Sequence, residues 1–266
     1  MEPRVSESNP KSLFDLTGKT AVVVGGTTGI GHSLSLGLAD AGADVIASSR
    51  RVEEVAKTAD EIEVKGRKTL RLTSDVKDRA SLISLREAVI EFFGKVDILV
   101  NCAGTTKRTP TLTVPEDEWN NIIETNLTGT LRGCQVFGEH MLQRGEGRII
   151  NIASLTTFLG FNEVAAYGAS KAAVGSLTKT LAVEWSKHGV LVNAIAPGMF
   201  RTALNSNLLD NTERGKELKL RTPMARWGHT DELIGAAVYL SSAASAFVAG
   251  EIIAVDGGFL ASGVNQ

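Results

Sequence analysis

The 266-residue chain lacks the features that mark several large protein classes. It has two cysteines, Cys102 and Cys134, without metal-ligand spacing, so the sequence predicts reduced structural thiols and no metal site. No apolar run reaches the roughly 18 residues of a membrane span, and the polar start lacks the apolar core of a signal peptide. Its 28 Lys and Arg balance 30 Asp and Glu, which leaves no basic excess for a nucleic-acid or membrane surface. We therefore expect a cytoplasmic protein whose partners are neither nucleic acids nor membranes.

What is present is a regular alternation of short apolar runs and helical patterns. Residues 1–12 are polar with two prolines and are expected to be a flexible lead-in, followed by a single domain over 13–266. Strands are expected over 19–24, from 43 to the Arg50-Arg51 pair, and over 68–73, 96–100, 148–152, 190–195 and 251–255. Helices are expected over about 31–41, 52–66, 78–93, 116–143, 165–187 and 230–240. This order predicts an α/β fold, a Rossmann-type doubly wound parallel sheet with helices on both faces.

A glycine-rich turn joins the first expected strand to the first helix. It reads Gly25-Gly26-Thr27-Thr28-Gly29-Ile30-Gly31 and directly follows a β-branched run. Gly25 permits a tight turn, Gly29 lets the backbone approach a pyrophosphate, and Gly31 allows the helix to pack closely on the strand. A phosphate would bind the free N–H groups at the start of the helix. The turn therefore predicts a dinucleotide cofactor whose contacts include Gly25, Thr27, Thr28, Gly29 and Ile30.

The end of the second strand indicates which dinucleotide is bound. Ser49, Arg50 and Arg51 lie about 20 residues beyond the glycine turn, where an NAD enzyme usually carries an acidic residue. An arginine suits the 2′-phosphate of NADP, so NADP is expected, with NAD as the alternative. Thr28 adds no support, since a second basic residue in the glycine turn would have strengthened the case for NADP. Two solvated arginines that cap a strand are the plainer explanation.

Further cofactor contacts are expected at the ends of the next two strands. Asp75 and Val76 follow the third expected strand, where Asp75 would hydrogen-bond an adenine amino group or serve only as a turn residue. Asn101 ends the fourth strand, and Ala103 and Gly104 after it are small enough for a cofactor to lie against the backbone. Ligands bind beyond the carboxyl ends of the strands in parallel sheets, which is where all these residues fall.

Tyr167 and Lys171 are the candidates for proton transfer. They lie four residues apart in an alanine-rich helical segment, so their side chains share one helix face. Holding a tyrosine as phenolate near pH 7 means lowering its pKa by about 3 units, or about 4 kcal/mol. A positive charge about 4 Å away, at an effective dielectric of about 20, supplies roughly that much. Tyr167 would then act as a general acid or base while Ser154 steadies the reacting oxygen, although an exposed helix face would carry the same residues.

Three other patterns bear on the site and on assembly. Asn126 lies inside the expected helix over 116–143, where asparagine is a poor helix former, so a bound water or a local kink is expected there. The helix over 165–187 is apolar around most of its circumference, which predicts a homo-oligomer. Residues 199–228 lose their periodicity after a strand end, which predicts a substrate lid or, more simply, a helical surface loop.

Together these motifs resemble the short-chain dehydrogenase/reductase family from about residue 13 onward. The match consists of Gly25-x-x-x-Gly29-Ile30-Gly31, Asn101-x-Ala103-Gly104, Asn126, Ser154, Tyr167-x-x-x-Lys171, Pro197-Gly198 and Asp256-Gly257-Gly258, with small departures at Val24 and Cys102. The resemblance implies that Tyr167 is the general acid/base and that Lys171 binds the nicotinamide ribose and lowers the tyrosine pKa. It implies that Ser154 orients the substrate carbonyl and that Asn126 holds a water in a proton relay. Cofactor contacts at Pro197, Gly198 and Thr202 follow as well, and a homotetramer is the favoured assembly.

Three segments further resemble the sugar-acid branch of that family, the gluconate 5-dehydrogenases and 2-dehydro-3-deoxygluconate dehydrogenases. They are residues 13–19, 101–108 and 222–228. We expect Ser154 and either Lys107 or Arg108 to contact the substrate, with the basic side chain binding its carboxylate. The alternative is that Lys107 and Arg108 are solvated loop residues. We expect an NADP-preferring oxidoreductase that interconverts a ketone and a secondary alcohol, on a keto-sugar acid or a similar small polar carbonyl compound. The rival interpretations are a 3-oxoacyl thioester reductase and, in a different class, a non-catalytic dinucleotide-binding scaffold.

Overall fold

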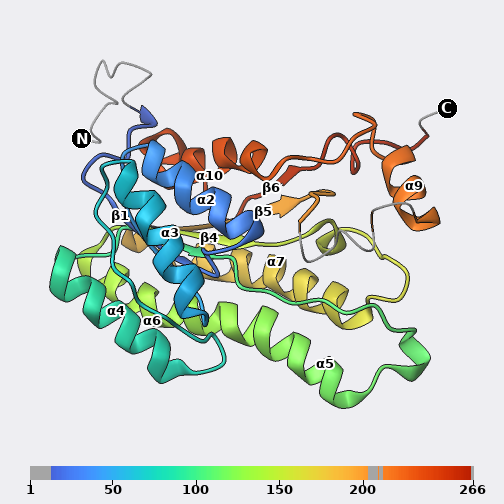
Figure 1. Ribbon diagram of the computed structural model, residues 1–266, viewed down its shortest axis with the longest axis horizontal. Helices are drawn as coiled ribbons and strands as arrows, with labels where there is room; N and C mark the ends of the chain where they lie inside the picture. Colours follow the sequence, from blue (N-terminus) through green and yellow to red (C-terminus); the bar gives the residue numbers. More distant parts are fainter. Residues whose placement is uncertain (1–12, 203–208, 210–211, 265–266) are drawn as a thin grey trace.

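The computed structural model describes residues 13–202, 209 and 212–264, so the expected lead-in over 1–12 lies outside the described residues. These residues form a six-stranded parallel sheet in the order β2-β1-β3-β4-β5-β6 (Figure 1). The strands are β1 Thr20–Val24, β2 Asp44–Ser48, β3 Ile98–Asn101, β4 Gly147–Ile152, β5 Val190–Pro197 and β6 Ile252–Val255. The chain runs outward from β1 to β2 and then returns to the other side of β1 with β3. This reversal is the switch point of a doubly wound sheet, as the sequence predicts.

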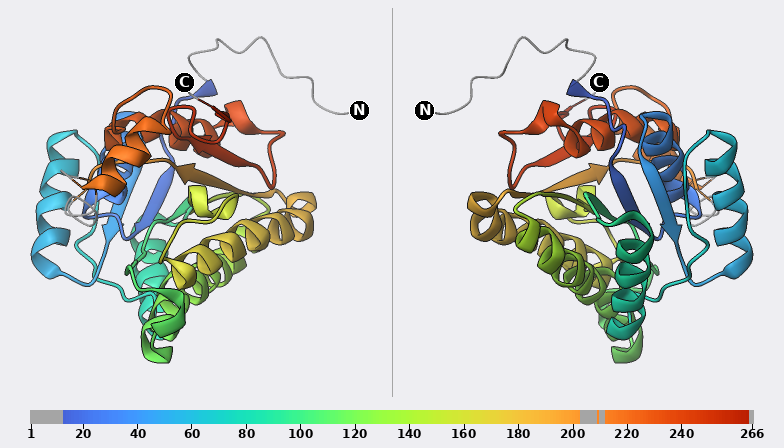
Figure 2. Two further views of the ribbon diagram at one scale, coloured as in Figure 1. Left: turned by 90° about the vertical axis from the view of Figure 1, so that its right-hand side faces the viewer. Right: turned by 90° about the vertical axis from the view of Figure 1, so that its left-hand side faces the viewer.

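Helices cover both faces of the sheet (Figure 2). They are α2 Gly29–Asp40, α3 Val52–Val64, α4 Arg79–Phe93, α5 Glu116–Ile123, α6 Gly129–Arg144, α7 Ala165–Trp185, α9 Glu213–Leu220 and α10 Ile234–Ser241. Short helical turns are η1 Thr111–Thr113, η2 Glu124–Thr128, η3 Leu155–Thr157, η4 Ser186–His188, η5 Thr230–Leu233 and η6 Ala243–Ser245. Within the described ranges, no helix is both long and apolar enough to cross a bilayer.

Alternate residues of each strand enter two separate hydrophobic cores. Val23 of β1 packs in a core with residues of α2, α3 and α10, whereas Val22 packs in a core with residues of α4, α6 and α7. Successive strand side chains point to opposite faces, so a strand covered on both sides must be apolar throughout. This requirement explains the continuous apolar run Ala21-Val22-Val23-Val24, which is buried completely or nearly so.

The strand predicted over 68–73 is not part of the sheet. This segment runs along the outer edge of β2 but makes backbone hydrogen bonds only near its two ends, Val45 N to Lys68 O at 3.2 Å and Ser74 N to Ser49 O at 3.0 Å. Between them the segment meets β2 through the Ser48 hydroxyl, which donates to the carbonyl of residue 72 at 2.7 Å. Side-chain contacts thus replace part of the ladder, so the prediction of a strand is wrong although the segment lies beside the sheet.

The long helix predicted over 116–143 is divided by a π-helical turn, η2. Asn126 lies in this turn and is fully buried. A π-turn inserts an extra residue into a helix and is frequently found at functional sites. The local irregularity expected at Asn126 is therefore present.

The described residues of the segment over 199–228 are partly helical. Its helix α9 contributes Leu218 to a small apolar cluster with Leu155 and Phe259. Phe200 and Gly228 form an isolated parallel bridge, which holds the two ends of the segment together. Figure 1 shows α9 at one end of the molecule, beyond the carboxyl ends of β5 and β6.

Candidate active site

A cleft of about 600 Å³ crosses the carboxyl ends of the central strands. Of the predicted cofactor residues, the cleft is lined by Gly25, Thr27, Thr28, Gly29, Ile30, Ser49, Arg50, Arg51, Asp75, Val76, Ala103, Gly104, Tyr167, Lys171 and Thr202. These residues come from segments far apart in the sequence. They meet because the strands are parallel and all end at the same edge of the sheet.

The glycine turn has the close contacts that its sequence predicts. Gly25 has a φ of 81°, and a Cβ added there would lie 2.5 Å from the backbone nitrogen of Ala103. A Cβ on Gly31 would lie 2.0 Å from the carbonyl oxygen of Gly25, so only glycine lets α2 begin this close to β1. The cap residue Thr28 makes no side-chain hydrogen bond to the helix. The first N–H groups of α2 therefore have no side-chain cap from Thr28, in a turn that lines the cleft, which suits a phosphate.

The basic residues after β2 lie at the same end of the cleft. The hydroxyls of Thr27 and Ser49 are hydrogen-bonded at 2.8 Å, which ties the glycine turn to the end of β2. Arg51 reaches back toward the turn, with its Nη2 3.5 Å from the hydroxyl oxygen of Thr28. Arg50 is exposed and also lines the cleft. Two guanidinium groups thus border the cleft at the end of β2, whereas Tyr167 and Lys171 lie beside the end of β4.

Asp75 lines the cleft and at the same time forms a local turn. One of its carboxylate oxygens accepts a hydrogen bond from the backbone N–H of Lys77 at 2.9 Å. Its own N–H donates to the hydroxyl of Ser81 at 3.0 Å. These bonds support the turn interpretation of Asp75, and its contact with an adenine amino group remains a prediction.

Three predicted cofactor residues do not line the cleft. The buried amide of Asn101 donates to the side-chain oxygen of Asn151 at 2.9 Å, so it joins β3 to β4 inside the sheet. Pro197 pairs with Val255, and the N–H of Gly198 donates to the carbonyl oxygen of Val255 at 2.8 Å. In this geometry these three residues shape the strand ends, and direct contact with a cofactor remains a prediction.

Tyr167 lies in the first turn of α7, with its hydroxyl close enough to the Ser154 side chain to be influenced by it. Ser154 directly follows β4 and also caps η3, where its Oγ accepts from the N–H of Thr156 at 3.2 Å. Burial raises the pKa of the Tyr167 phenol above its ordinary value, and the interaction with Ser154 lowers it by a smaller amount. The expectation that a lysine charge would lower this pKa is therefore not met in this geometry, where desolvation dominates.

Lys171 lies one turn beyond Tyr167 on α7, as the spacing predicts. Its ammonium donates to the carbonyl oxygen of Ile152 at 2.6 Å and lies 5.8 Å from the centre of the Tyr167 ring. The side chain is 5% exposed, and burial lowers the pKa of Lys171 to about 8. The ammonium is thus directed at the carbonyl oxygen at the end of β4.

Asn126 links the π-turn to the loop after β3 and to α7. Its Oδ1 accepts from the N–H of Thr105 at 2.8 Å, and its Nδ2 donates to the Thr105 carbonyl at 2.9 Å and to the hydroxyl of Ser170 at 3.1 Å. Ser170 in turn donates to the backbone carbonyl of Tyr167 at 2.7 Å. The side-chain amide is occupied by protein groups, so its expected role as a water ligand stays a prediction.

The two candidate carboxylate-binding residues are both paired with acidic side chains. The ammonium of Lys107 lies 2.6 Å from a carboxylate oxygen of Glu118. The Nε of Arg108 is hydrogen-bonded to Glu163, which lies just before α7. Both residues follow the loop after β3 that lines the cleft, but neither lines the cleft itself.

The cleft has further lining residues that were not predicted as cofactor contacts. They are Val24, Gly31, Ser74, Lys77, Cys102, Thr105, Asn121, Thr125 and Ile152. Most of them are direct neighbours of predicted residues, so extending each motif by one position would have found them. Asn121 and Thr125 belong to α5 and the π-turn, and the only available signal is that they are four residues apart and share a helix face.

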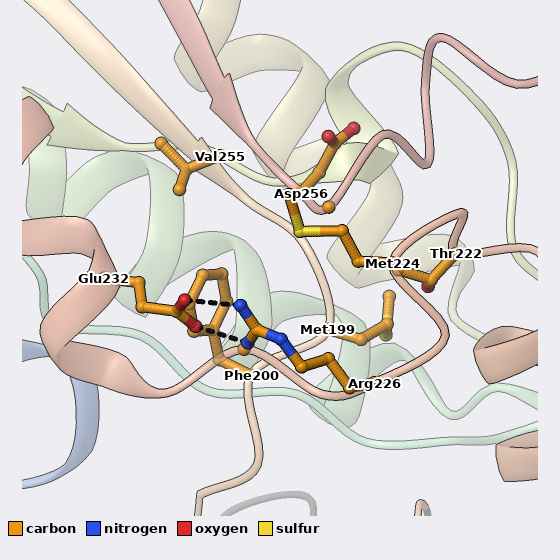
Figure 3. A pocket seen from close by; sticks show the side chains of 10 residues that line it. Met199, Phe200, Thr222, Met224, Arg226, Glu232, Val255 and Asp256 are labelled. Carbon is orange, nitrogen blue, oxygen red and sulfur yellow. Dashed lines mark hydrogen bonds and ion pairs between the residues drawn. The ribbon is translucent and has the colours of Figure 1, made fainter.

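A second pocket of about 240 Å³ lies at the base of the 199–228 segment (Figure 3). In Figure 3 the guanidinium of Arg226 faces the carboxylate of Glu232, and the two are joined by hydrogen bonds of 2.6 and 2.7 Å. The hydrogen bond with Arg226 is the main reason that the pKa of Glu232 falls to about 2. The charges of Arg226 and Glu232 neutralise each other at the wall of this pocket. We therefore interpret the pair as an anchor for the 199–228 segment.

The assembled cleft supports transfer of a proton at one end and binding of an anionic group at the other. The Tyr167 and Ser154 hydroxyls would hold one oxygen atom between them, with the ammonium of Lys171 nearby. The glycine turn and two arginines lie at the other end of the cleft. This arrangement has the shape and charge that a dinucleotide requires.

Comparisons with known proteins give the following similarities. Residues 19–213 match the family model described as short chain dehydrogenase. The 2-dehydro-3-deoxy-D-gluconate 5-dehydrogenase of Bacillus subtilis is 43% identical over 249 residues, which cover 93% of this chain and 96% of that protein. The gluconate 5-dehydrogenase of Gluconobacter oxydans is 39% identical over 250 residues, which cover 94% and 98%. A crystal structure of a gluconate 5-dehydrogenase from Burkholderia cenocepacia, in complex with NADP and tartrate, has a TM-score of 0.92 and 38% identity and covers 96% of this chain and 100% of its own.

Proposed function

Because the chain belongs to the short-chain dehydrogenase family, we propose that it is an NADP-dependent oxidoreductase that interconverts a ketone and a secondary alcohol. The observation that carries the proposal is that Tyr167, close to Ser154 and with the ammonium of Lys171 5.8 Å from its ring centre, lines a dinucleotide-sized cleft. The nicotinamide supplies the hydride to a carbonyl carbon, or takes it back from the alcohol. The residues of the chain bind the cofactor and the substrate and transfer the proton.

Tyr167 is the residue that moves the proton. In the direction of reduction its hydroxyl donates a proton to the carbonyl oxygen, and the raised pKa keeps the phenol protonated at neutral pH. Ser154 donates a hydrogen bond to the same oxygen, or to the phenolate that forms. Lys171 holds a positive charge close to the Tyr167 ring, which favours the phenolate when the reverse reaction needs a base.

The phosphates of the cofactor would lie on the glycine turn at the start of α2. Support comes from the uncapped N–H groups behind Thr28 and from the small residues Gly25 and Gly29. Arg50 and Arg51 would bind the 2′-phosphate that distinguishes NADP from NAD. NADP is also what the Burkholderia cenocepacia relative holds in its crystal structure.

For the substrate we propose a keto-sugar acid. The relatives are named for gluconate and 2-dehydro-3-deoxy-D-gluconate, and they are similar to this chain over almost their whole length. Arg108, three residues after Thr105 of the cleft, supports a carboxylate-bearing substrate because a guanidinium binds a carboxylate in two hydrogen bonds. Lys107, which is paired with Glu118 at 2.6 Å, is the second candidate.

Turnover of NADPH with a panel of carbonyl compounds tests the reaction. The wild type is expected to oxidise NADPH with 5-keto-D-gluconate, and Tyr167→Phe is expected to lose most of this rate, on the order of a hundredfold or more, while it still binds the cofactor. The matched control is Tyr239→Phe, because Tyr239 is the other tyrosine of the chain and lies on α10. A protein that binds NADPH but reduces no compound would instead be a scaffold, and activity confined to acetoacetyl thioesters would identify a thioester reductase.

Comparison of the two cofactors tests the role of Arg50. Arg50→Ala is expected to weaken NADPH binding by about tenfold or more and to leave NADH binding nearly unchanged, since only NADPH carries the 2′-phosphate. Lys57→Ala removes a positive charge from the neighbouring helix α3, away from the lining of the cleft, and serves as the control. Preference for NADH in the wild type, with no effect of Arg50→Ala, would show that the cofactor assignment is wrong.

We also propose a homo-oligomer, with a tetramer favoured, that works in the cytoplasm. Support for assembly comes from α7, where Val174 is buried against the sheet whereas Val183 is 80% exposed. An apolar side chain on an otherwise exposed helix face favours a second subunit as its cover. Light scattering of the purified protein gives the subunit number directly.

A further inference from the structure

An arginine of α9 contacts the loop that precedes α7, the helix that carries Tyr167 and Lys171. Arg214 lies in the first turn of α9, and its Nη1 donates to the carbonyl oxygen of Asn162 at 2.9 Å. Its Nε is buried and has no hydrogen-bond partner among the described residues. A buried guanidinium nitrogen without an acceptor is costly, because such groups are normally satisfied by protein, water or a ligand. Among the described residues, the hydrogen-bonding capacity of Arg214 is therefore not fully satisfied.

The same loop holds Arg108, so two guanidinium groups converge there. Glu163 pairs with Arg108 through its side chain, and its carbonyl oxygen accepts from the N–H of Thr109 at 2.8 Å. Glu163 has a φ of 63°, a left-handed conformation that is unfavourable for a glutamate. Such strain persists where the surrounding structure enforces it, and it is often found at functional sites. The contacts made by Arg108 and Thr109 are what fix this residue.

The cluster of Arg108, Glu163 and Arg214 is connected to the proton-transfer residues and to the cleft by short stretches of chain and by packing. Glu163 lies four residues before Tyr167, and Arg108 lies three residues after Thr105 of the cleft lining. Helix α9 is held there by Leu218, which packs with Leu155, the residue next to Ser154. In Figure 1, α9 and the loop before α7 lie at the same end of the molecule. A substrate whose carbonyl meets Tyr167 would therefore direct its other end toward this cluster.

The two positive charges of the cluster lie close enough to repel each other. Arg108 and Arg214 face Glu163 as their shared acidic neighbour, and Glu217, one turn along α9, also attracts Arg214. Burial lowers the pKa of the Arg214 guanidinium, and the like charge of Arg108 lowers it further. A further carboxylate, supplied by a ligand, would offset this repulsion. Residues 199–228 carry an excess of basic residues, since they include six basic residues, Arg201, Arg214, Lys216, Lys219, Arg221 and Arg226, and three acidic ones, Asp210, Glu213 and Glu217.

We propose that Arg214, together with Arg108, forms the subsite that binds the carboxylate of the substrate, and that Glu163 positions Arg108 within it. Arg214 is then a specificity-determining residue that selects a keto acid over an uncharged ketone of the same length. The proposal rests on the proposed function for the substrate class, but it adds Arg214, a residue that the motifs of the active site do not include. Two guanidinium groups suit this task, because each can bind a carboxylate through paired N–H donors.

The test compares an acid with its uncharged analogue in two kinds of measurement. Steady-state kinetics are measured with 5-keto-D-gluconate and with a ketose that has a hydroxymethyl group in place of the carboxylate. Arg214→Met is expected to raise the KM for the acid by about ten- to a hundredfold with kcat nearly unchanged, and to leave the uncharged ketose unaffected. Arg214→Lys keeps the charge but not the paired donors, and is expected to lie between the two. Lys216→Met is the control, since Lys216 is on the same helix, 70% exposed and paired with Glu213.

Ligand binding without turnover separates this proposal from the proposed function. Calorimetric titration of the NADP-loaded protein with gluconate and with sorbitol is expected to show preference for gluconate in the wild type and loss of that preference in Arg214→Met. This result supports the carboxylate subsite even if no keto-sugar acid is turned over. If the enzyme reduces 5-keto-D-gluconate but Arg214→Met leaves both the KM and the gluconate preference unchanged, the subsite is refuted and the proposed function stands. Equal losses for acid and uncharged ligands would assign Arg214 a structural role. The same conclusion would follow if Arg214→Met bound neither ligand while Arg214→Lys bound both as the wild type does.

Discussion

The charge on Lys171 should make the stability of the protein depend on pH in a direction that can be worked out. The side chain is 5% exposed, and burial lowers the pKa of its ammonium from 10.5 to about 8. Below about pH 8 the group is protonated in both the folded and the unfolded protein, and the folded protein bears the full cost of burying the charge. Between about pH 8 and 10.5 the folded protein releases this proton first. The contribution of Lys171 to the free energy of unfolding therefore rises over that window.

The magnitude follows from the difference in pKa. From 10.5 to about 8 is roughly 2.5 units, and at about 1.4 kcal/mol per unit the buried charge costs about 3 kcal/mol at pH 7. Lys171→Met removes this cost but also removes the hydrogen bond to the carbonyl oxygen of Ile152, at a loss of about 1 to 3 kcal/mol. The variant should therefore be close to wild type in stability near pH 7. Relative to wild type, its stability should fall by about 2 to 3 kcal/mol as the pH is raised to about 10.

Denaturant unfolding at a series of pH values from 7 to about 10 measures this change, at one fixed protomer concentration because an oligomer gains stability by mass action. Titration of the other groups is common to both proteins and largely cancels in the difference. Lys179→Met is the control, because Lys179 is exposed on the same helix and its substitution should give no such change. A difference between wild type and Lys171→Met that stays constant over the whole pH range would refute the buried-ammonium account.

Three further predictions concern other parts of the chain. Asp97 is 3% exposed and accepts hydrogen bonds from one backbone N–H and two cationic side chains, so Asp97→Ala should lower the free energy of unfolding by about 3 kcal/mol without changing kcat, as measured by urea unfolding and steady-state kinetics. Gly25→Ala would place a Cβ 2.5 Å from the backbone of Ala103 and should abolish cofactor binding or folding, whereas Gly18→Ala, at a similar φ of 78° but with no described atom within 4 Å, should cost only about 1 kcal/mol. Burial raises the pKa of the Cys102 thiol to about 11, so at pH 8 its alkylation by iodoacetamide should be on the order of a hundredfold slower than that of an exposed thiol, and a rate equal to that of free cysteine would contradict this.

The parts of the site that sequence reasoning found are those set by local spacing. The glycine turn, the pair Tyr167 and Lys171, and the placement of strand ends at one edge all depend on a few neighbouring residues and on the rule that parallel strands share a direction. The sheet itself was predictable for the same reason, since a strand that is apolar throughout, such as β1, must be covered by helices on both faces. Among the described residues of the sheet, the segment over 68–73 was misassigned as a strand, because alternation of residue types does not reveal whether a neighbouring strand pairs with it along its full length.

What the sequence could not provide is the electrostatic balance of the site. The spacing of Tyr167 and Lys171 suggested a lowered phenol pKa, but burial outweighs it, and burial depends on loops from distant parts of the chain. Arg214 was not singled out because its contact with Asn162 spans 52 positions in the sequence. The pairing of Arg108 with Glu163 escaped notice for the same reason, since it joins residues 55 positions apart.

The π-turn at Glu124–Thr128 takes up one residue more than a regular helix would hold between α5 and α6. Because the wider turn absorbs this residue within about one helical turn, the helices on either side keep their faces. The widened turn thus lets Asn126 leave the regular helical pattern and bond to Thr105 and Ser170, while Asn121 on α5 still faces the cleft.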